Sequence, residues 1–139
     1  MKFQKHDTLY VICLDLGEKI KQTLTSFCER EHIYGGFISG LGAVSEAEIA
    51  HYPLSEKRYN TQRFVGEYEV MNLTGNVASL DGKPFLHLHI TLGDREYHAF
   101  GGHLVEGIAS PTLEVLLTHI PGLLTRKHDE ATGLKLLDL

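Results

Sequence analysis

The stretch GEYEVMNLTGNVASLDGKPFLHLHITL, residues 66–92, alternates apolar and polar side chains along most of its length. An alternation with a period of two predicts β-strands that are buried on one face, and we expect three of them here. The Asp81-Gly82 pair favours a tight hairpin turn between the last two strands. From Leu86 to Leu92 every second residue is leucine or isoleucine, so this face of the last strand is predicted to lie in the core.

Segments on both sides of this stretch add one helix and further strands. Residues 17–32, GEKIKQTLTSFCEREH, carry apolar side chains at helical spacing and predict an amphipathic helix that ends before Gly35. The further strands are expected in TLYVICLDL (8–16), as two short strands broken at Gly40–Gly42 in GGFISGLGAVSEAEIAHY (35–52), in REYHAFGGHL (95–104) and in PTLEVLLTHI (111–120). The tail RKHDEATGLKLLDL (126–139) is expected to pack its leucines on the body.

One early helix and many short strands predict an α+β fold with a single domain over residues 1–139. We expect a mostly antiparallel β-sheet or half-barrel that is covered on one side by the helix. The succession of strand 8–16, the helix and strand 35–52 also allows a βαβ crossover with locally mixed pairing. A chain of 139 residues is long enough to bury a core without disulfides.

Charge and cysteine content bear on partners and compartment. The chain has 13 Lys and Arg against 18 Asp and Glu, a net charge of -5, whereas proteins that grip nucleic acid unaided usually carry a basic patch. Direct DNA binding is therefore disfavoured.

Cys13 and Cys28 lack a C-x-x-C spacing and are expected to be buried thiols of a reduced compartment. A polar start, Met1–His6, and the lack of a long apolar run predict a cytoplasmic protein without a membrane span.

Three histidines form the main candidate site. His87 and His89 project from the same polar strand face with α-carbons about 6.5 to 7 Å apart, a separation that two imidazoles span to hold one ion. After the Gly93-Asp94 turn, the returning strand brings His103 beside them, and two preceding glycines permit close approach. Three neutral imidazoles suit Zn²⁺ best, with Cu, Ni or Fe as alternatives, and leave a fourth position for water or a small anion. The alternative interpretation is a pair of solvated histidines on an exposed strand face.

Two other histidines are weaker candidates. His98 lies on the returning strand at an odd offset from His103, which puts it on the opposite face unless a bulge at Gly101-Gly102 changes the register. His51 is interpreted as a surface histidine.

Three carboxylates are available by chain position: Glu67, Glu69 and Asp94. We expect them either near the metal, or in contact with a partner, or as solvated surface groups. Two functions of the histidines follow as alternatives. One is a zinc-dependent enzyme that uses a metal-bound water on a small, possibly anionic, substrate; the other is a structural metal site closed by a fourth protein ligand.

Several motifs, in their order and spacing, resemble one known family. They are GGFISGLGAVSEAEI, GEYEVMNLTGNV, GKPFLHLHITLGD, FGGHL, LEVLLTHIPG and DEATGLKLLDL. Together they resemble the PPC domain (plants and prokaryotes conserved), of the prokaryotic stand-alone type, over residues 9–139. The resemblance implies an antiparallel sheet with few helices, a homotrimer, and a metal, generally assigned as zinc, on the positions matching His87, His89 and His103.

The resemblance also implies a DNA-associated or regulatory role. Plant members bind the DNA minor groove through AT-hooks, and this sequence contains no such Arg-Gly-Arg-Pro segment. Its basic clusters, at 57–63 and 126–128, are interpreted as solvated loops, so DNA binding is expected to be weak and dependent on salt even if a trimer gathers three copies. In plant members the segment matching GEYEVM (66–71) contacts partner proteins. Here Glu67 replaces a basic residue of that motif, so this partner specificity is not carried over.

Overall fold

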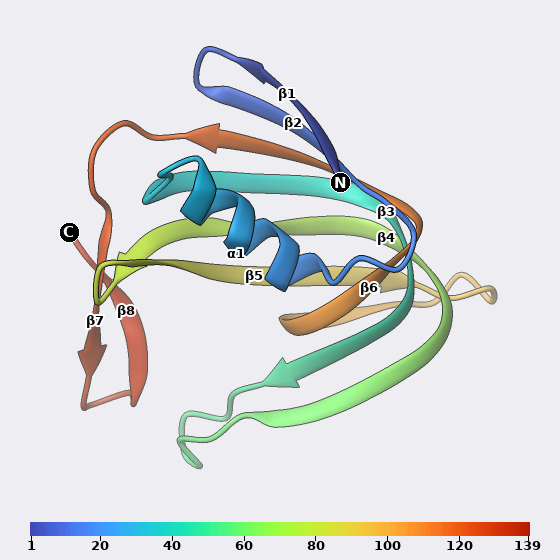
Figure 1. Cartoon of the computed structure of the whole chain (residues 1–139). Coiled ribbons are helices and arrows are strands. Elements are labelled where there is room, and N and C mark those ends of the chain that lie inside the picture. Colours follow the sequence, from blue (N-terminus) through green and yellow to red (C-terminus); the bar gives the residue numbers. More distant parts are fainter.

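The computed structural model describes residues 1–139 as one curled sheet with a single helix packed on it (Figure 1). This 11-residue helix does not meet the length and hydropathy that a membrane-spanning helix requires. The elements follow the chain as β1 (Lys2–His6), β2 (Leu9–Leu14), α1 (Ile20–Arg30), β3 (Gly35–His51), β4 (Asn60–Leu80), β5 (Lys83–Gly93), β6 (Ala99–His119), β7 (Thr125–Asp129) and β8 (Leu134–Asp138).

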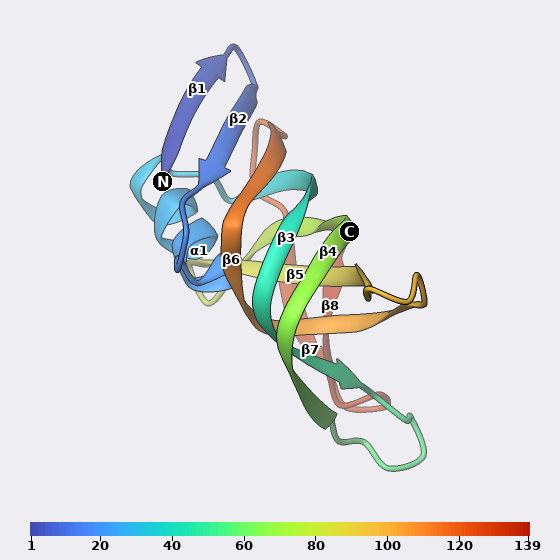
Figure 2. The same ribbon diagram turned by 90° about the vertical axis from the view of Figure 1, so that its right-hand side faces the viewer.

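The sheet is strongly curled, and four of its strands pair in a closed ring. Its strand order is β1-β2-β6-β3-β4-β7-β8, and β5 pairs with both β4 and β6. Strands β3, β4, β5 and β6 thus form a closed ring of pairings, and Figure 2 shows β6, β3 and β4 in front of β5. Pairing is antiparallel except for a single parallel contact between Ser79 of β4 and Thr125 of β7. The predicted α+β fold with an antiparallel half-barrel is confirmed.

The helix α1 buries one stripe of side chains against the sheet. The buried side chains of this stripe are Ile20, Leu24, Phe27 and Cys28. They join one core with the buried leucine and isoleucine face of β5. Burial raises the pKa of the Cys28 thiol to about 12, and both cysteines are free.

Strands β2 and β3 both pair antiparallel with β6, so they run parallel to each other with β6 between them. The expected crossover through α1 therefore exists, but its two strands are not direct neighbours.

Several strands are longer than the sequence pattern predicts. Residues 35–51 form one strand rather than two, because register shifts at Gly40/Gly42 and Val44/Glu46 absorb the irregularity without ending the pairing. In the same way Pro111 lies inside β6 rather than at the start of a separate strand. Opposite it, Gly42 and Val44 of β3 pair with Leu113 and Ala109, so Pro111 sits in a bulge that needs no ladder hydrogen bond.

The structure also differs from the prediction in residues 66–92 and at both ends of the described chain. Residues 66–92 contain two strands rather than three, because β4 runs unbroken from Asn60 to Leu80, and the Asp81-Gly82 hairpin is confirmed. The polar segment Lys2–His6 forms β1, which the sequence pattern missed because all its side chains are exposed at the sheet edge. The tail folds into the β7–β8 hairpin and packs only part of its leucines: Leu139 is 96% exposed.

Candidate metal centre

Strand β5 carries two of the three candidate histidines on its polar face. The alternate residues from Leu86 to Leu92 are buried in the core, which leaves His87 and His89 on the opposite face, as predicted. His89 pairs directly with His103 of β6, across the closure of the sheet. His103 also pairs with Ala50 of β3, so three strands fix its position.

Two glycines let the neighbouring strands approach β5 at the histidines. A Cβ at Gly75 of β4 would collide with the backbone carbonyl oxygen of His87, and one at Gly101 of β6 would collide with that of Ile90. Gly102, next to His103, would likewise press on Ile49 and Ala50 of β3. The glycines of the LTGN and GGH motifs therefore serve close approach of backbones around the candidate site.

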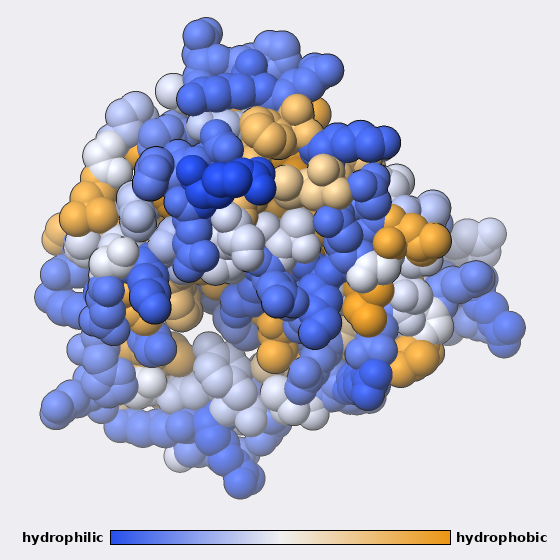
Figure 3. Space-filling model, viewed as in Figure 1, coloured by the Kyte–Doolittle hydropathy of each residue, from blue (hydrophilic) through white to orange (hydrophobic).

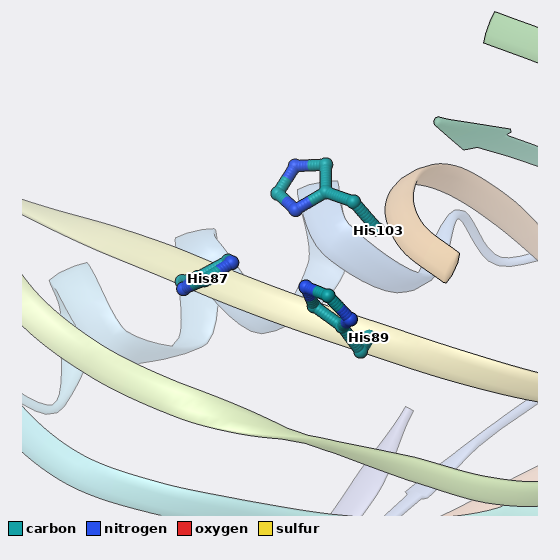
Figure 4. A group of neighbouring side chains, drawn as sticks. All are labelled: His87, His89 and His103. Atoms are coloured by element: carbon teal, nitrogen blue, oxygen red, sulfur yellow. The ribbon is translucent and has the colours of Figure 1, made fainter. Parts of the chain in front are cut away.

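The structure brings the three predicted histidines together (Figure 4). Ring centres lie 5.1 Å apart for His87 and His89, 5.1 Å for His87 and His103, and 5.6 Å for His89 and His103. One ligand atom from each residue lies within 4.8 Å of the other two. Small side-chain shifts bring nitrogen atoms within this spacing to the metal–nitrogen distance of about 2.0–2.1 Å that one shared zinc ion requires.

The surroundings keep two of these rings neutral. Burial lowers the pKa of His87 to about 4, with smaller contributions from Arg126 and His89. Burial also lowers the pKa of His103 to about 4, with a smaller contribution from Lys21. Neutral imidazole is the form that binds metals. The Nδ1 atom of His103 is buried without a hydrogen-bond partner, so the chemistry and the orphaned nitrogen both fit a transition-metal ion.

The three predicted carboxylates lie apart from the triad. Glu69 on β4 pairs with Gly93, about 13 Å along β5 from His89 at the usual strand rise. Glu67 is exposed on the same strand. Asp94 accepts hydrogen bonds from the backbone N–H and the ring of His98, and these bonds lower its pKa. It therefore organises the β5–β6 turn.

The weaker histidine candidates stay outside the cluster. His98 falls in the turn before β6, where its Nδ1 lies 3.2 Å from Asp94 Oδ2, so the question of its strand face does not arise. His51 is exposed at the end of β3.

A cavity of about 250 Å³ opens beside the triad. Figure 3 shows the molecule hollowed below α1, between the β7–β8 hairpin and the loop that joins β3 to β4. Its wall includes the side chains of Tyr59, Phe85, His87, His103, Arg126 and Lys135. Sequence reasoning missed Tyr59, Arg126 and Lys135 at this wall, because it interpreted the clusters around Tyr59 and Arg126 as solvated loops and expected the tail only to pack its leucines. The basic character of 126–128 was the one available signal.

Comparison with known proteins gives one family. Residues 1–121 match the family model described as the Plants and Prokaryotes Conserved (PCC) domain. A crystal structure of a "putative DNA binding protein" from Bacteroides thetaiotaomicron is 30% identical, covers 99% of this chain and 96% of that chain, and superposes with a TM-score of 0.96. A metal-containing protein from Archaeoglobus fulgidus is 32% identical, with coverage of 99% and 97% and a TM-score of 0.89.

The chain is also similar to a third solved structure and to part of a curated protein. A plant- and prokaryote-conserved (PPC) protein from Pyrococcus horikoshii is 32% identical over 99% of this chain and 94% of that chain, with a TM-score of 0.88. Among curated proteins, the bifunctional protein GlmU of two Synechococcus strains is 29% identical over 128 residues, or 90% of this chain. The chain spans only 19% of the length of those GlmU proteins.

Proposed function

Because this chain belongs to the Plants and Prokaryotes Conserved (PCC) domain family, we propose that it is a metal-binding domain whose ion is held by His87, His89 and His103. The convergence of three imidazoles, with ligand atoms within 4.8 Å of one another, carries this proposal. The similarity to a metal-containing protein supports it. Nitrogen ligands favour Zn²⁺ or a neighbouring transition metal, since Mg²⁺ and Ca²⁺ take oxygen ligands.

The proposed centre is open. No carboxylate or thiol joins the three histidines in the cluster, so a tetrahedral ion keeps one position for water or a small anion. The ion supplies Lewis-acid chemistry at that position when bound. A structural site usually uses four protein ligands. The arrangement therefore favours a ligand-binding or catalytic centre over a purely structural one.

Replacing His87 with alanine tests the proposal directly. We expect the H87A variant to lose stoichiometric metal, because two remaining imidazoles hold an ion much less firmly. Elemental analysis of protein purified without an affinity tag gives the readout. The matched control is H98A, which removes an exposed imidazole outside the cluster and should keep the wild-type metal content. Unchanged metal in the H87A variant would overturn the assignment.

A DNA-associated role is a second candidate, favoured by similarity to a "putative DNA binding protein". The charges of this chain limit direct binding. Its net charge is -5, and in the two basic clusters Arg58, Arg63 and Lys127 each form a salt bridge with a carboxylate. We therefore propose that the association is weak for the isolated domain, or is made through a partner.

Fluorescence anisotropy with a labelled DNA duplex tests this second candidate. At physiological salt we expect no complex tighter than about 1 µM, the strong end of non-specific binding. Affinity should also fall steeply as salt is added, because only phosphate contacts contribute. A tight and sequence-selective complex would contradict the expectation and make direct DNA binding the leading function.

We also propose that the chain assembles as a homotrimer, as its resemblance to the family implies. Trimerisation places three metal centres and three copies of every surface patch in one particle. A weak contact with an extended partner would gain strength from such repetition.

A further inference from the structure

Two cations line the cavity beside the triad, and a third lies near the Phe85 ring at its wall. The Arg126 guanidinium of β7 lies 5.3 Å from the Phe85 ring centre, and the Lys135 ammonium of β8 lies 5.5 Å from it. Lys21, at the start of α1, places its ammonium 5.9 Å from the same ring. Three cations therefore surround one aromatic side chain of β5.

No acidic side chain forms a salt bridge with this cluster. No Asp or Glu lines the cavity. The carboxylate of Glu106 accepts hydrogen bonds from the backbone N–H groups of Lys21, Gln22 and Gly107, and its charge opposes the effect of burial on the pKa of Lys21. Glu106 is thus committed to the N-terminus of α1.

Arg126 donates hydrogen bonds only to neutral acceptors. One goes to Asn76 Oδ1 at 2.6 Å and another to the Lys135 carbonyl oxygen at 2.5 Å. The Nε atom of Arg126 is buried without a partner. These bonds orient the guanidinium at the cavity wall and leave its charge and several of its five N–H groups free for a ligand.

Of the three cations, Lys21 and Arg126 are partly buried and Lys135 is exposed. Clustered cations that are partly buried are unfavourable without a counter-charge. Burial lowers the pKa of Lys21 and of Arg126, which shows that water solvates these groups incompletely. An anion in the cavity relieves both the mutual repulsion and the lost hydration.

The remaining wall is apolar and aromatic. Phe85, Leu134 and Leu136 line the cavity, and the Tyr59 ring packs 5.0 Å from the His103 ring at a 31° tilt. A cavity of 150 Å³ holds benzene, so about 250 Å³ accommodates one ring with a charged head group. The guanidinium fork pairs with carboxylates and phosphates alike, so the apolar wall and the size of the cavity are what favour a carboxylate with a flat apolar body.

We propose that this cavity binds a small carboxylate with a flat apolar body, about the size of benzoate, through Arg126 and Lys135. The apolar body lies against Phe85 and the leucines of β8. This proposal rests on the metal-binding function proposed above, because it names the ligand class of the same site. The carboxylate enters beside His87 and His103, where the open position of the centre is expected.

Calorimetric titration with benzoate at low ionic strength tests the proposal. Benzamide has the same shape without the charge, and acetate has the charge without the ring, so both should bind at least tenfold more weakly. The R126Q and K135Q variants should each lose about tenfold or more in benzoate affinity, as expected for a hydrogen bond to a charged group. The K127Q variant is the matched control, since Lys127 pairs with Asp138 outside the cavity, and it should bind like the wild type.

The outcomes distinguish a failure of the carboxylate proposal from a failure of the metal-binding proposal. Elemental analysis measures the metal content of every sample, and R126Q and K135Q should keep the wild-type content because neither residue is in the triad. Wild-type protein with metal but no benzoate binding, equal binding of benzamide, or undiminished binding by both variants overturns the carboxylate proposal. Tighter binding of inorganic phosphate than of benzoate also overturns it. Lack of metal in the wild type overturns the metal-binding function instead, whatever the titration shows.

Discussion

His87 and His103 are partly buried next to cations, and burial and positive charge both disfavour a proton on an imidazole. The pKa of each is lowered to about 4, well below the usual value of about 6.5. A ring that stays neutral when folded but takes up a proton when unfolded couples folding to pH.

The metal-free protein should therefore lose stability as pH falls from about 6.5 to about 4. Within this window the unfolded chain binds more protons at His87 and His103 than the folded chain does, so acid favours unfolding. Above about pH 6.5 His87 and His103 are neutral in both the folded and the unfolded chain, so they no longer make the free energy of unfolding depend on pH. Urea unfolding of chelator-treated protein at pH 7 and pH 5 measures the difference.

The H87Q variant is the control for this pH effect, since glutamine keeps a polar side chain and does not titrate. Its free energy of unfolding should change less between the two pH values than that of the wild type. An equal change in both proteins would assign the pH dependence to other groups.

Among the elements, the β7–β8 hairpin completes the cavity but is joined to the sheet by few bonds. Its strand pairing with β4 is limited to Ser79 and Thr125, and Arg126 donates a hydrogen bond to Asn76 of β4. Elsewhere the Tyr52 hydroxyl donates to the Thr132 carbonyl oxygen. Strands β3 and β4, in contrast, pair along nearly their whole length. Segments with few buried contacts open at lower free energy than the core.

We expect the amide protons of β7 and β8 to exchange about tenfold or more faster than those in the centres of β3 and β4. Hydrogen–deuterium exchange read by mass spectrometry measures this, and the exposed edge strand β1 serves as an internal comparison. Equal protection of the hairpin and the central strands would show that the hairpin belongs to the cooperative core. Addition of benzoate should slow exchange in β7 and β8 selectively.

At the scale of the whole molecule, one outer face of the sheet leaves apolar side chains exposed. This apolar stripe consists of Val11, Phe37, Leu41 and Leu116, which are 41 to 57% exposed. The register places Val11 opposite Leu116 and Leu116 opposite Ser39, between Phe37 and Leu41, so the stripe crosses β2, β6 and β3. Covering such a stripe with other copies of the chain removes apolar surface from water.

Sedimentation analysis should give a particle of three times the 15.5 kDa of one chain, as proposed above. The L116E variant should shift this mass toward the monomer, because it places a charge in the apolar stripe. The L123E variant changes an exposed leucine outside the stripe and should keep the wild-type mass. A monomeric wild type would contradict the trimer, and a trimeric L116E variant would place its interface elsewhere.

Local patterns in the sequence were enough to predict which face of an individual strand is buried. The alternation from Leu86 to Leu92 predicted the buried side of β5 and the shared face of His87 and His89. The Asp81-Gly82 turn and the buried stripe of α1 followed for the same reason, since the period of a strand or helix depends only on neighbouring residues. Strand ends were predicted less well, because bulges at Gly42 and Pro111 continue pairing where composition suggests a break.

The sequence by itself determined which side chains each strand offers, and its motifs indicated the family. The sequence also predicted that the strand after the Gly93-Asp94 turn returns His103 to this pair, and the tertiary structure decided the register, in which His89 lies opposite His103 and His87 is within reach. The tertiary structure also brought Arg126 and Lys135 to the same cavity from a hairpin about 40 residues along the chain. Contacts between distant segments arise from sheet curvature and long-range pairing, and no local periodicity carries that information.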